Sequence, residues 1–218
     1  MTPAASETLR RITTLGLLPV VELGSVDDAG PLLDALVAGG LPAAEITLRT
    51  DAGLTAIAAL RQSHPDALVG AGTVRSADEA RRVIDAGAQF VVSPGTSPEV
   101  LDVSRSAGVP AIPGVCTPTE VDSALRSGAE AVKFFPAEAM GGPPFLQALA
   151  GPFRGVPFIP TGGINASNVA DYLRLPSVVA CGGSWMVAPA LLAEGRFDRI
   201  EKLTREGMAI VAEVRRRA

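Results

Sequence analysis

Short apolar runs alternate along this chain with longer amphipathic stretches. Each run is mostly Ala, Val, Leu or Ile and is followed by a segment in which polar residues return at helical spacing. Continuously apolar strands separated by helices are typical of a parallel sheet whose faces are covered by helices. The eight runs lie at residues 17–23, 43–48, 67–72, 90–93, 110–113, 131–135, 157–160 and 178–182.

The stretches between the runs carry signals for helix ends. Ser76 and Thr117 are each followed three positions later by a glutamate, which predicts capping boxes, and Pro118 suits a first helical position. Two further helices are predicted outside the repeat, a short one over residues 6–14 and a C-terminal one over Phe197–Arg217. The chain is therefore expected to contain strands and helices in regular alternation, with one helix at each end.

Eight strand–helix units in about 200 residues predict a compact (β/α)8 TIM barrel. No linker or low-complexity segment interrupts the pattern, so residues 1–218 are expected to form one domain. An open doubly wound sheet is the alternative. Against it, the first strand–helix turn, around Gly24, lacks the G-x-G-x-x-G fingerprint of dinucleotide-binding sheets.

Composition narrows the classes of function. A net charge of −4 argues against a nucleic-acid partner, and no apolar run approaches the ~20 residues of a membrane span. The N-terminus has no signal-peptide pattern, and only Cys116 and Cys181 are present, so a reducing cytoplasm is expected. One histidine and two separated cysteines exclude a transition-metal site with nitrogen and sulfur ligands, whereas a carboxylate site for Mg²⁺ stays open.

A lysine lies inside an apolar run. Only two of the nineteen basic residues are lysines, and one of them, Lys133, stands in the segment AVKFFP at residues 131–136. Burial costs a lysine its hydration unless it is paired or neutral, and a neutral amine attacks carbonyl carbon. The alternative is a lysine that extends to solvent or pairs with a buried carboxylate. Glu138, close by in sequence, is interpreted as an acid at a helix start.

A polar stripe follows one face of the second run. Glu45, Thr47 and Arg49 alternate with apolar residues, so all three are expected to face the barrel lumen. Lys133 and Phe135 share the lumen face of the sixth run. A buried Glu–Arg pair that fills the barrel is the alternative. If the carboxylate and the lysine converge, they supply what a Schiff-base enzyme needs, a nucleophilic amine and a general acid/base.

Glycine-rich turns follow several runs. Thr73 ends the turn after the third run, where its hydroxyl either holds a carboxylate or caps a helix. Glycine loops after the seventh and eighth runs occupy the place where barrels commonly hold phosphate, and such loops present backbone N–H groups to an anion. The two loops are PTGGIN at residues 160–165 and CGGSW at residues 181–185.

The ordered set of motifs resembles the family of 2-keto-3-deoxy-6-phosphogluconate (KDPG) aldolases, also called KDPG/4-hydroxy-2-oxoglutarate aldolases. The resemblance spans roughly residues 10 to 205, and it implies a class I aldolase on a TIM barrel, usually a homotrimer, that needs no cofactor or metal. The implied partners are pyruvate and a phosphorylated keto acid. The matching segments are GG at 39–40, EITLRT at 45–50, VGAGTV at 69–74, SPG at 93–95, KFFPAE at 133–138, PTGGI at 160–164 and GGSW at 182–185.

The resemblance also implies roles for individual residues. Lys133 is similar to the Schiff-base lysine, and Glu45 to the general acid/base acting through a water. Arg49 and Thr73 resemble the groups that hold the pyruvyl carboxylate. These roles agree with the interpretation of the residues themselves.

Further roles are implied around the phosphorylated end of the substrate. Thr161 resembles the residue that influences stereochemistry at the aldol carbon, while Phe135 and Pro94 resemble pocket walls. Some relatives end the first strand with a basic residue, whereas this chain has Glu22 there. An anion contact from this strand is therefore not implied, and Glu22 is expected either to face away or to pair with an arginine. The phosphate cradle is implied at Gly162, Gly163, Gly183 and Ser184.

Three other functions fit parts of the pattern. An aldolase for the galactonate epimer of KDPG would carry the same motifs, and 4-hydroxy-2-oxoglutarate is a further candidate substrate. A sugar-phosphate epimerase or isomerase would share the phosphate loops without needing a lumen lysine. A non-catalytic sugar-phosphate binder would keep its affinity for ligand without turnover.

Overall fold

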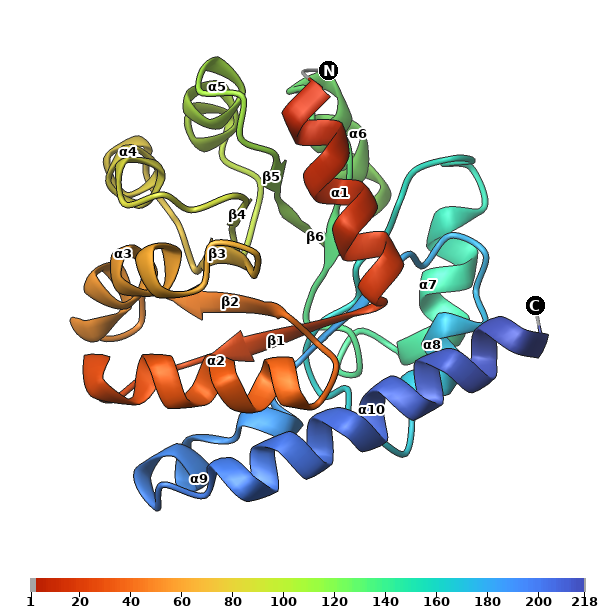
Figure 1. Cartoon of the computed structure of the whole chain (residues 1–218). Helices are drawn as coiled ribbons and strands as arrows, with labels where there is room; N and C mark the ends of the chain where they lie inside the picture. Colours follow the sequence, from red (N-terminus) through yellow and green to blue (C-terminus); the bar gives the residue numbers. More distant parts are fainter. Residues whose placement is uncertain (1–2, 218) are drawn as a thin grey trace.

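A parallel sheet curled into a half-barrel forms the centre of the computed structural model, which describes residues 3–217 (Figure 1). Six strands pair in the order β5-β4-β3-β2-β1-β8, and β6 pairs with β7 in a separate two-stranded sheet. The strands are β1 Leu17–Val21, β2 Ala43–Thr47, β3 Leu68–Gly72, β4 Val91–Val92, β5 Ala111–Ile112, β6 Gly114–Val115, β7 Lys133–Phe134 and β8 Cys181–Gly183.

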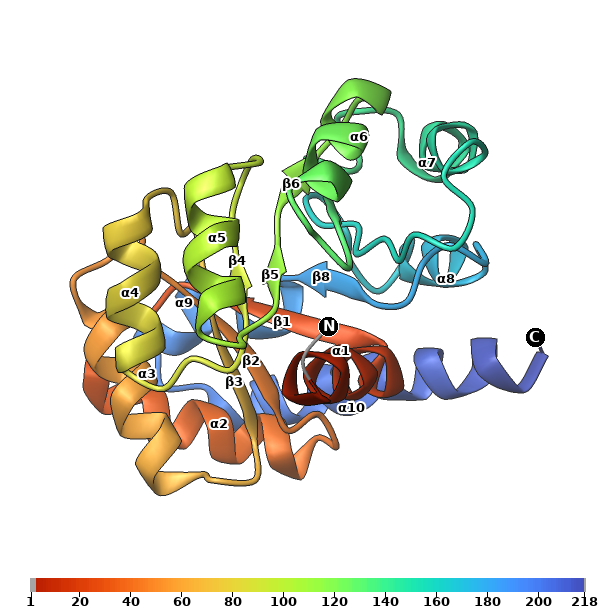
Figure 2. The same cartoon turned by 90° about the horizontal axis from the view of Figure 1, so that it is seen from above.

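Helices cover the outer side of the curled sheet (Figures 1 and 2). The C-terminal helix α10 packs against both α2 and α8, and it begins and ends where the sequence predicts. The N-terminal helix is longer than the predicted 6–14. The helices are α1 Pro3–Leu15, α2 Ala29–Ala38, α3 Ala52–Ser63, α4 Ala77–Asp85, α5 Pro98–Ser106, α6 Pro118–Arg126, α7 Gly142–Ala150, α8 Val169–Leu173, α9 Pro189–Ala193 and α10 Phe197–Arg217, with 3-10 turns η1 Val26–Asp28 and η2 Trp185–Val187.

The strand order follows the sequence and then returns to its start. Neighbours β1 to β5 are consecutive, and β1 also pairs with β8, with Leu17 opposite Cys181. A doubly wound sheet would instead reverse its order beside the first strand. The order of the described strands therefore favours the curled sheet over the open alternative. Buried Ala, Val, Leu and Ile side chains dominate the continuous core around it.

Two of the predicted runs do not form a single continuous strand. The run at 110–113 yields β5 and β6 on either side of Pro113, and the run at 157–160 forms no named strand. Phe158 alone in that run makes bridges, to Val132 and Val178. The flanking prolines at 157 and 160 lack the backbone N–H that a ladder requires, so pairing is limited to single positions.

Helix starts agree in part with the predicted caps. The capping box at Thr117 is complete, because Thr117 and Glu120 each accept from the other's backbone N–H. At Ser76 only half of the box forms: Ser76 caps the helix, but the Glu79 carboxylate accepts from the Arg75 N–H instead. Among the helices of residues 3–217, none combines the length and apolar character needed to cross a bilayer.

Candidate active site

Lys133 and Glu45 meet inside the curled sheet although they lie on different sheets of the fold. Lys133 on β7 is 6% exposed and Glu45 on β2 is 1% exposed. The lysine Nζ donates to Glu45 Oε1 at 3.5 Å, the upper limit of a hydrogen bond. The Phe135 ring centroid lies 5.1 Å from the same nitrogen. The structure thus brings together the amine and the carboxylate that the sequence expects to converge.

The neighbouring strands hold the Glu45 carboxylate in place. Gly72 on β3 lies so close that a Cβ there would be 2.4 Å from Glu45 Oε1, which explains why a glycine occupies this position. Two residues along β2 from Glu45, the Thr47 hydroxyl donates to the Val21 carbonyl at 2.9 Å and ties β2 to β1. The carboxylate therefore has little freedom to move away from Lys133.

Three polar side chains gather where β1, β2 and β3 end. Arg49 Nε donates to the Thr73 hydroxyl at 3.3 Å, and Arg49 Nη1 lies 3.5 Å from Glu22 Oε2. Thr73 has a φ of 60°, a left-handed conformation that costs a non-glycine residue on the order of 1 kcal/mol. Arg49 is therefore held from both sides, with further N–H groups of its guanidinium available to a ligand.

A cavity of about 250 Å³ opens beside this cluster. Seven of the predicted site residues line it. Thr73 adjoins it through its hydrogen bond with Arg49, Lys133 through its contact with the Phe135 ring, and Glu45 through Val20, its partner on the neighbouring strand. Pro94 does not line the cavity; it is exposed in the turn after β4. The described lining residues are Val20, Val21, Glu22, Thr47, Arg49, Phe135, Thr161, Gly162, Gly163, Ile164, Gly183, Ser184 and Pro189.

The first glycine loop is supported by a residue that the sequence interpretation left outside the site. Gly162 and Gly163 have φ values of 103° and 81°. The Glu138 N–H donates to the Gly162 carbonyl at 3.0 Å, and a Cβ at Gly163 would lie 2.7 Å from the Glu138 side chain. Because α7 begins only at Gly142, the interpretation of Glu138 as a helix-start acid is wrong.

A buried tyrosine completes this support. The Tyr172 hydroxyl on α8 donates to the Glu138 carboxylate. Burial, followed by this hydrogen bond, raises the pKa of the Tyr172 hydroxyl, so the hydroxyl stays protonated and remains a donor. The pair connects α8 to the segment that packs under Gly163. No sequence periodicity signals this contact, because its partners are far apart along the chain.

A single β-bridge joins the second glycine loop, at residues 181–185, to the first. Thr161, which is buried, pairs with Gly182, and a Cβ at Gly182 would lie 2.2 Å from the Thr161 hydroxyl oxygen. A Cβ at Gly183 would collide with the Trp185 ring at 1.9 Å. Both positions therefore require glycine, and the two loops line one side of the same cavity.

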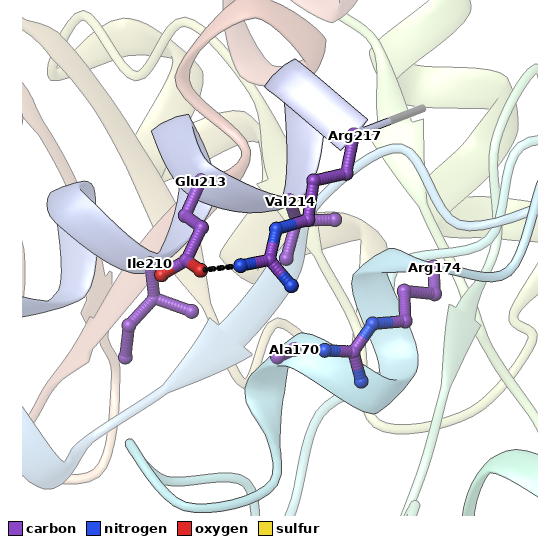
Figure 3. Close-up of a pocket in the computed structure, with 6 residues that line it drawn as sticks. All are labelled: Ala170, Arg174, Ile210, Glu213, Val214 and Arg217. Carbon is purple, nitrogen blue, oxygen red and sulfur yellow. Dashed lines mark ion pairs between the residues drawn. The ribbon is translucent and has the colours of Figure 1, made fainter.

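A second hollow, of about 330 Å³, lies between α8 and α10 (Figure 3). Its guanidinium groups already pair with carboxylates on their own helices, Arg217 with Glu213 and Arg174 with Asp171, both at 2.6 Å. This hollow shares no lining residue with the cavity beside Arg49. Within residues 3–217, no three His, Cys, Asp or Glu side chains are grouped so that they could hold a metal ion.

Comparison with known proteins identifies the family. The family model described as KDPG and KHG aldolase matches residues 9–203. The chain belongs to the KDPG and KHG aldolase family. Members of this family are carbon–carbon lyases, and the resemblance drawn from the sequence motifs is confirmed.

Relatives match the aldolase chain over nearly its whole length. It is 47% identical to the 2-dehydro-3-deoxy-phosphogluconate aldolase of Treponema pallidum, covering 94% of this chain and 96% of the relative. It is 45% identical to the KHG/KDPG aldolase of Escherichia coli K12, covering 90% and 92%. Among solved structures, the KDPG aldolase of Legionella pneumophila, with pyruvate captured as a covalent carbinolamine, has a TM-score of 0.88 at 39% identity, covering 91% of this chain and 96% of that one.

Proposed function

We propose that this chain is a class I aldolase that cleaves KDPG to pyruvate and glyceraldehyde 3-phosphate. The observation that carries the proposal is the buried pair of Lys133 and Glu45, 3.5 Å apart beside a cavity with glycine loops. A Schiff-base aldolase needs an amine shielded from water, a carboxylate to move protons and a site for an anionic substrate. The carbinolamine captured in the Legionella relative is the same kind of intermediate.

The first half of the reaction forms an electron sink at Lys133. Its neutral amine adds to the C2 ketone, and loss of water from the carbinolamine leaves a cationic imine. Glu45 then takes the proton of the C4 hydroxyl, by way of a water. The C3–C4 bond breaks, its electrons move into the imine to give an enamine, and the aldehyde leaves.

The second half regenerates the enzyme. Glu45 returns its proton to C3 of the enamine, which restores the imine of pyruvate, and water then releases pyruvate from Lys133. Only one carboxylate is needed, because the base of the cleavage step becomes the acid of the protonation step. Burial of Glu45 between β1 and β3 supports this double role, since it keeps the carboxylate at one place throughout.

The remaining site residues are proposed to hold the substrate. Arg49 and Thr73, already joined by a hydrogen bond, bind the C1 carboxylate, and Thr161 influences stereochemistry at C4. Phe135 forms a wall of the cavity, whereas Pro94, which does not line it, is proposed as a second wall from the family motif alone. The phosphate is proposed to bind at Gly162, Gly163, Gly183 and Ser184.

We further propose a complete (β/α)8 barrel formed by residues 1–218 as one domain. The bridges of Phe158 to Val132 and Val178 support closure, because they link β7 to the segment before β8. A homotrimer is the assembly proposed from the family, and the cytoplasm is the compartment proposed from the sequence. Light scattering on the purified protein measures the number of chains per particle.

A second substrate, 4-hydroxy-2-oxoglutarate, is supported by the name of the Escherichia coli relative, which includes both activities. Cleavage of that substrate would give pyruvate and glyoxylate by the same steps. The galactonate epimer of KDPG is a third candidate, since the motifs do not distinguish the configuration at C4. Comparing kcat/KM for the three substrates ranks them.

Trapping with borohydride tests the proposed function. Incubation with pyruvate and borohydride is expected to add one pyruvate-derived mass at Lys133. The matched control is Lys202→Arg, which changes the other lysine and should leave the adduct in place, whereas Lys133→Arg should abolish it. An adduct at Lys202 would overturn the role assigned to Lys133, and the absence of any adduct would favour an epimerase, an isomerase or a binding protein.

A further inference from the structure

The rim of the cavity carries its polar groups in a fixed spatial order. Because β3, β2, β1 and β8 are neighbours in that order, the residues after them follow one another around the rim. Thr73 follows β3, Arg49 lies beyond β2, Glu22 follows β1, and Ser184 follows β8. Glu22 therefore lies between the proposed carboxylate-binding residues and the proposed phosphate loops.

Glu22 is placed to touch what enters the cavity. Among the described residues that line it, Glu22 is the one carboxylate and Arg49 the one cation. The Glu22 side chain is 43% exposed, and its contact with Arg49 is long, at 3.5 Å. A carboxylate has about four acceptor positions, so this single long contact leaves acceptor capacity for a ligand.

The substrate must cross this point. If C1 binds at Arg49 and the C6 phosphate binds at the glycine loops, the carbons between them pass the end of β1. In KDPG this part of the chain carries hydroxyl groups, including one at C5. In 4-hydroxy-2-oxoglutarate C5 is itself a carboxylate. The two candidate substrates therefore present opposite chemistry to Glu22.

We infer that Glu22 is a specificity-determining residue that favours a keto acid with a hydroxyl at C5 over one with a carboxylate there. A hydroxyl donates a hydrogen bond to the Glu22 carboxylate, and hydrogen bonds to charged acceptors are the stronger ones. A C5 carboxylate offers no proton and is repelled by the like charge. This inference rests on the proposed function, because it assumes that both keto acids bind with C1 at Arg49.

The test compares two substrates on one variant. Glu22→Gln keeps the size of the side chain and removes its charge. We expect it to shift the ratio of kcat/KM for KDPG over 4-hydroxy-2-oxoglutarate about tenfold toward the latter, which corresponds to about 1.4 kcal/mol. The shift should shrink as ionic strength rises, since Glu22 is partly exposed to solvent and its charge is screened.

The matched control is Glu206→Gln, which removes the same charge from the exposed side of α10 and should leave the ratio unchanged. Equal losses on both substrates would overturn the inference, because Glu22 would then serve only to orient Arg49. An unchanged ratio would overturn it as well. Glu22→Ala, measured in parallel, should shift the ratio in the same direction.

Borohydride trapping of each variant distinguishes failure of the role inferred for Glu22 from failure of the proposed function. If pyruvate adds to Lys133 in the wild type and in Glu22→Gln while the ratio stays constant, the role of Glu22 is wrong and the aldolase proposal stands. If the wild type forms no adduct, the proposed function itself has failed.

Discussion

Replacing Gly72 by alanine should displace Glu45 without changing any group that reacts. An alanine Cβ would lie 2.4 Å from Glu45 Oε1 and 2.8 Å from its Cγ. Carbon atoms in ordinary contact are about 3.5–4.0 Å apart, so the carboxylate must move by roughly 1 Å. Gly72 is not among the described glycines with positive φ, so the backbone itself accepts alanine.

The effect on turnover follows from that displacement. Glu45 is buried, at 1% exposure, among closely packed neighbours, so the movement changes its distance from Lys133, now 3.5 Å. A misplacement of 1 Å in a reacting constellation costs about 10²-fold in rate. Overpacking is also expected to lower the free energy of unfolding by about 1–3 kcal/mol.

A coupled assay for pyruvate release measures kcat and KM, and circular dichroism with thermal unfolding checks the fold. We expect Gly72→Ala to reduce kcat/KM about a hundredfold while pyruvate still adds to Lys133 under borohydride. The control is Gly30→Ala on α2, where a new Cβ meets nothing within 4 Å. That variant should keep full activity and gain slightly in stability, since alanine is the better helix former.

Wild-type turnover by a folded Gly72→Ala protein would refute this reasoning. It would mean either that the carboxylate relaxes without consequence or that another group moves the proton. An equal loss in Gly30→Ala would point to a general effect of glycine replacement.

Three further outcomes are expected. Glu45→Gln should lower kcat by about 10²–10⁴-fold with a much smaller change in KM, and a raised KM with intact kcat would make Glu45 a binding residue. Gly163→Val should lower kcat/KM more for KDPG than for 4-hydroxy-2-oxoglutarate, because a Cβ there would lie 2.7 Å from the Glu138 side chain and displace the loop proposed to bind the phosphate; equal losses would indicate general distortion. Burial raises the pKa of the Cys181 thiol, which keeps it protonated and unreactive at pH 8, so a thiol reagent should modify Cys116 first and reach Cys181 only on unfolding.

Periodicity predicts the parts of this fold that repeat. The long apolar runs became β1, β2 and β3, and the C-terminal helix was correct to its ends, because continuous patterns depend on local geometry. The convergence of Lys133 and Glu45 could also be predicted from the sequence, since alternate residues of a strand face the same side of the sheet. The run at 157–160 does not form a strand, because its prolines lack the backbone N–H groups that pair neighbouring strands. A pattern of apolar residues does not reveal this loss.

Contacts between distant segments lie beyond such patterns. The hydrogen bond from Tyr172 to Glu138 joins segments far apart in the sequence, and nothing at either position signals its partner. For Glu22 the sequence allows pairing with an arginine, but it does not identify Arg49 as the partner. The left-handed backbone of Thr73 is likewise invisible, because threonine is a poor candidate for a positive φ.

The pairing of β1 with β8 has a consequence for synthesis of the protein. A nascent chain that ends after α8 already contains Lys133 and Glu45, yet the β1 edge that β8 will occupy is still unpaired. An unpaired parallel edge exposes backbone N–H and C=O groups that template aggregation. The last segment from β8 to α10 therefore protects the finished sheet, and a chain shortened before residue 181 should aggregate instead of accumulating as a partly active enzyme.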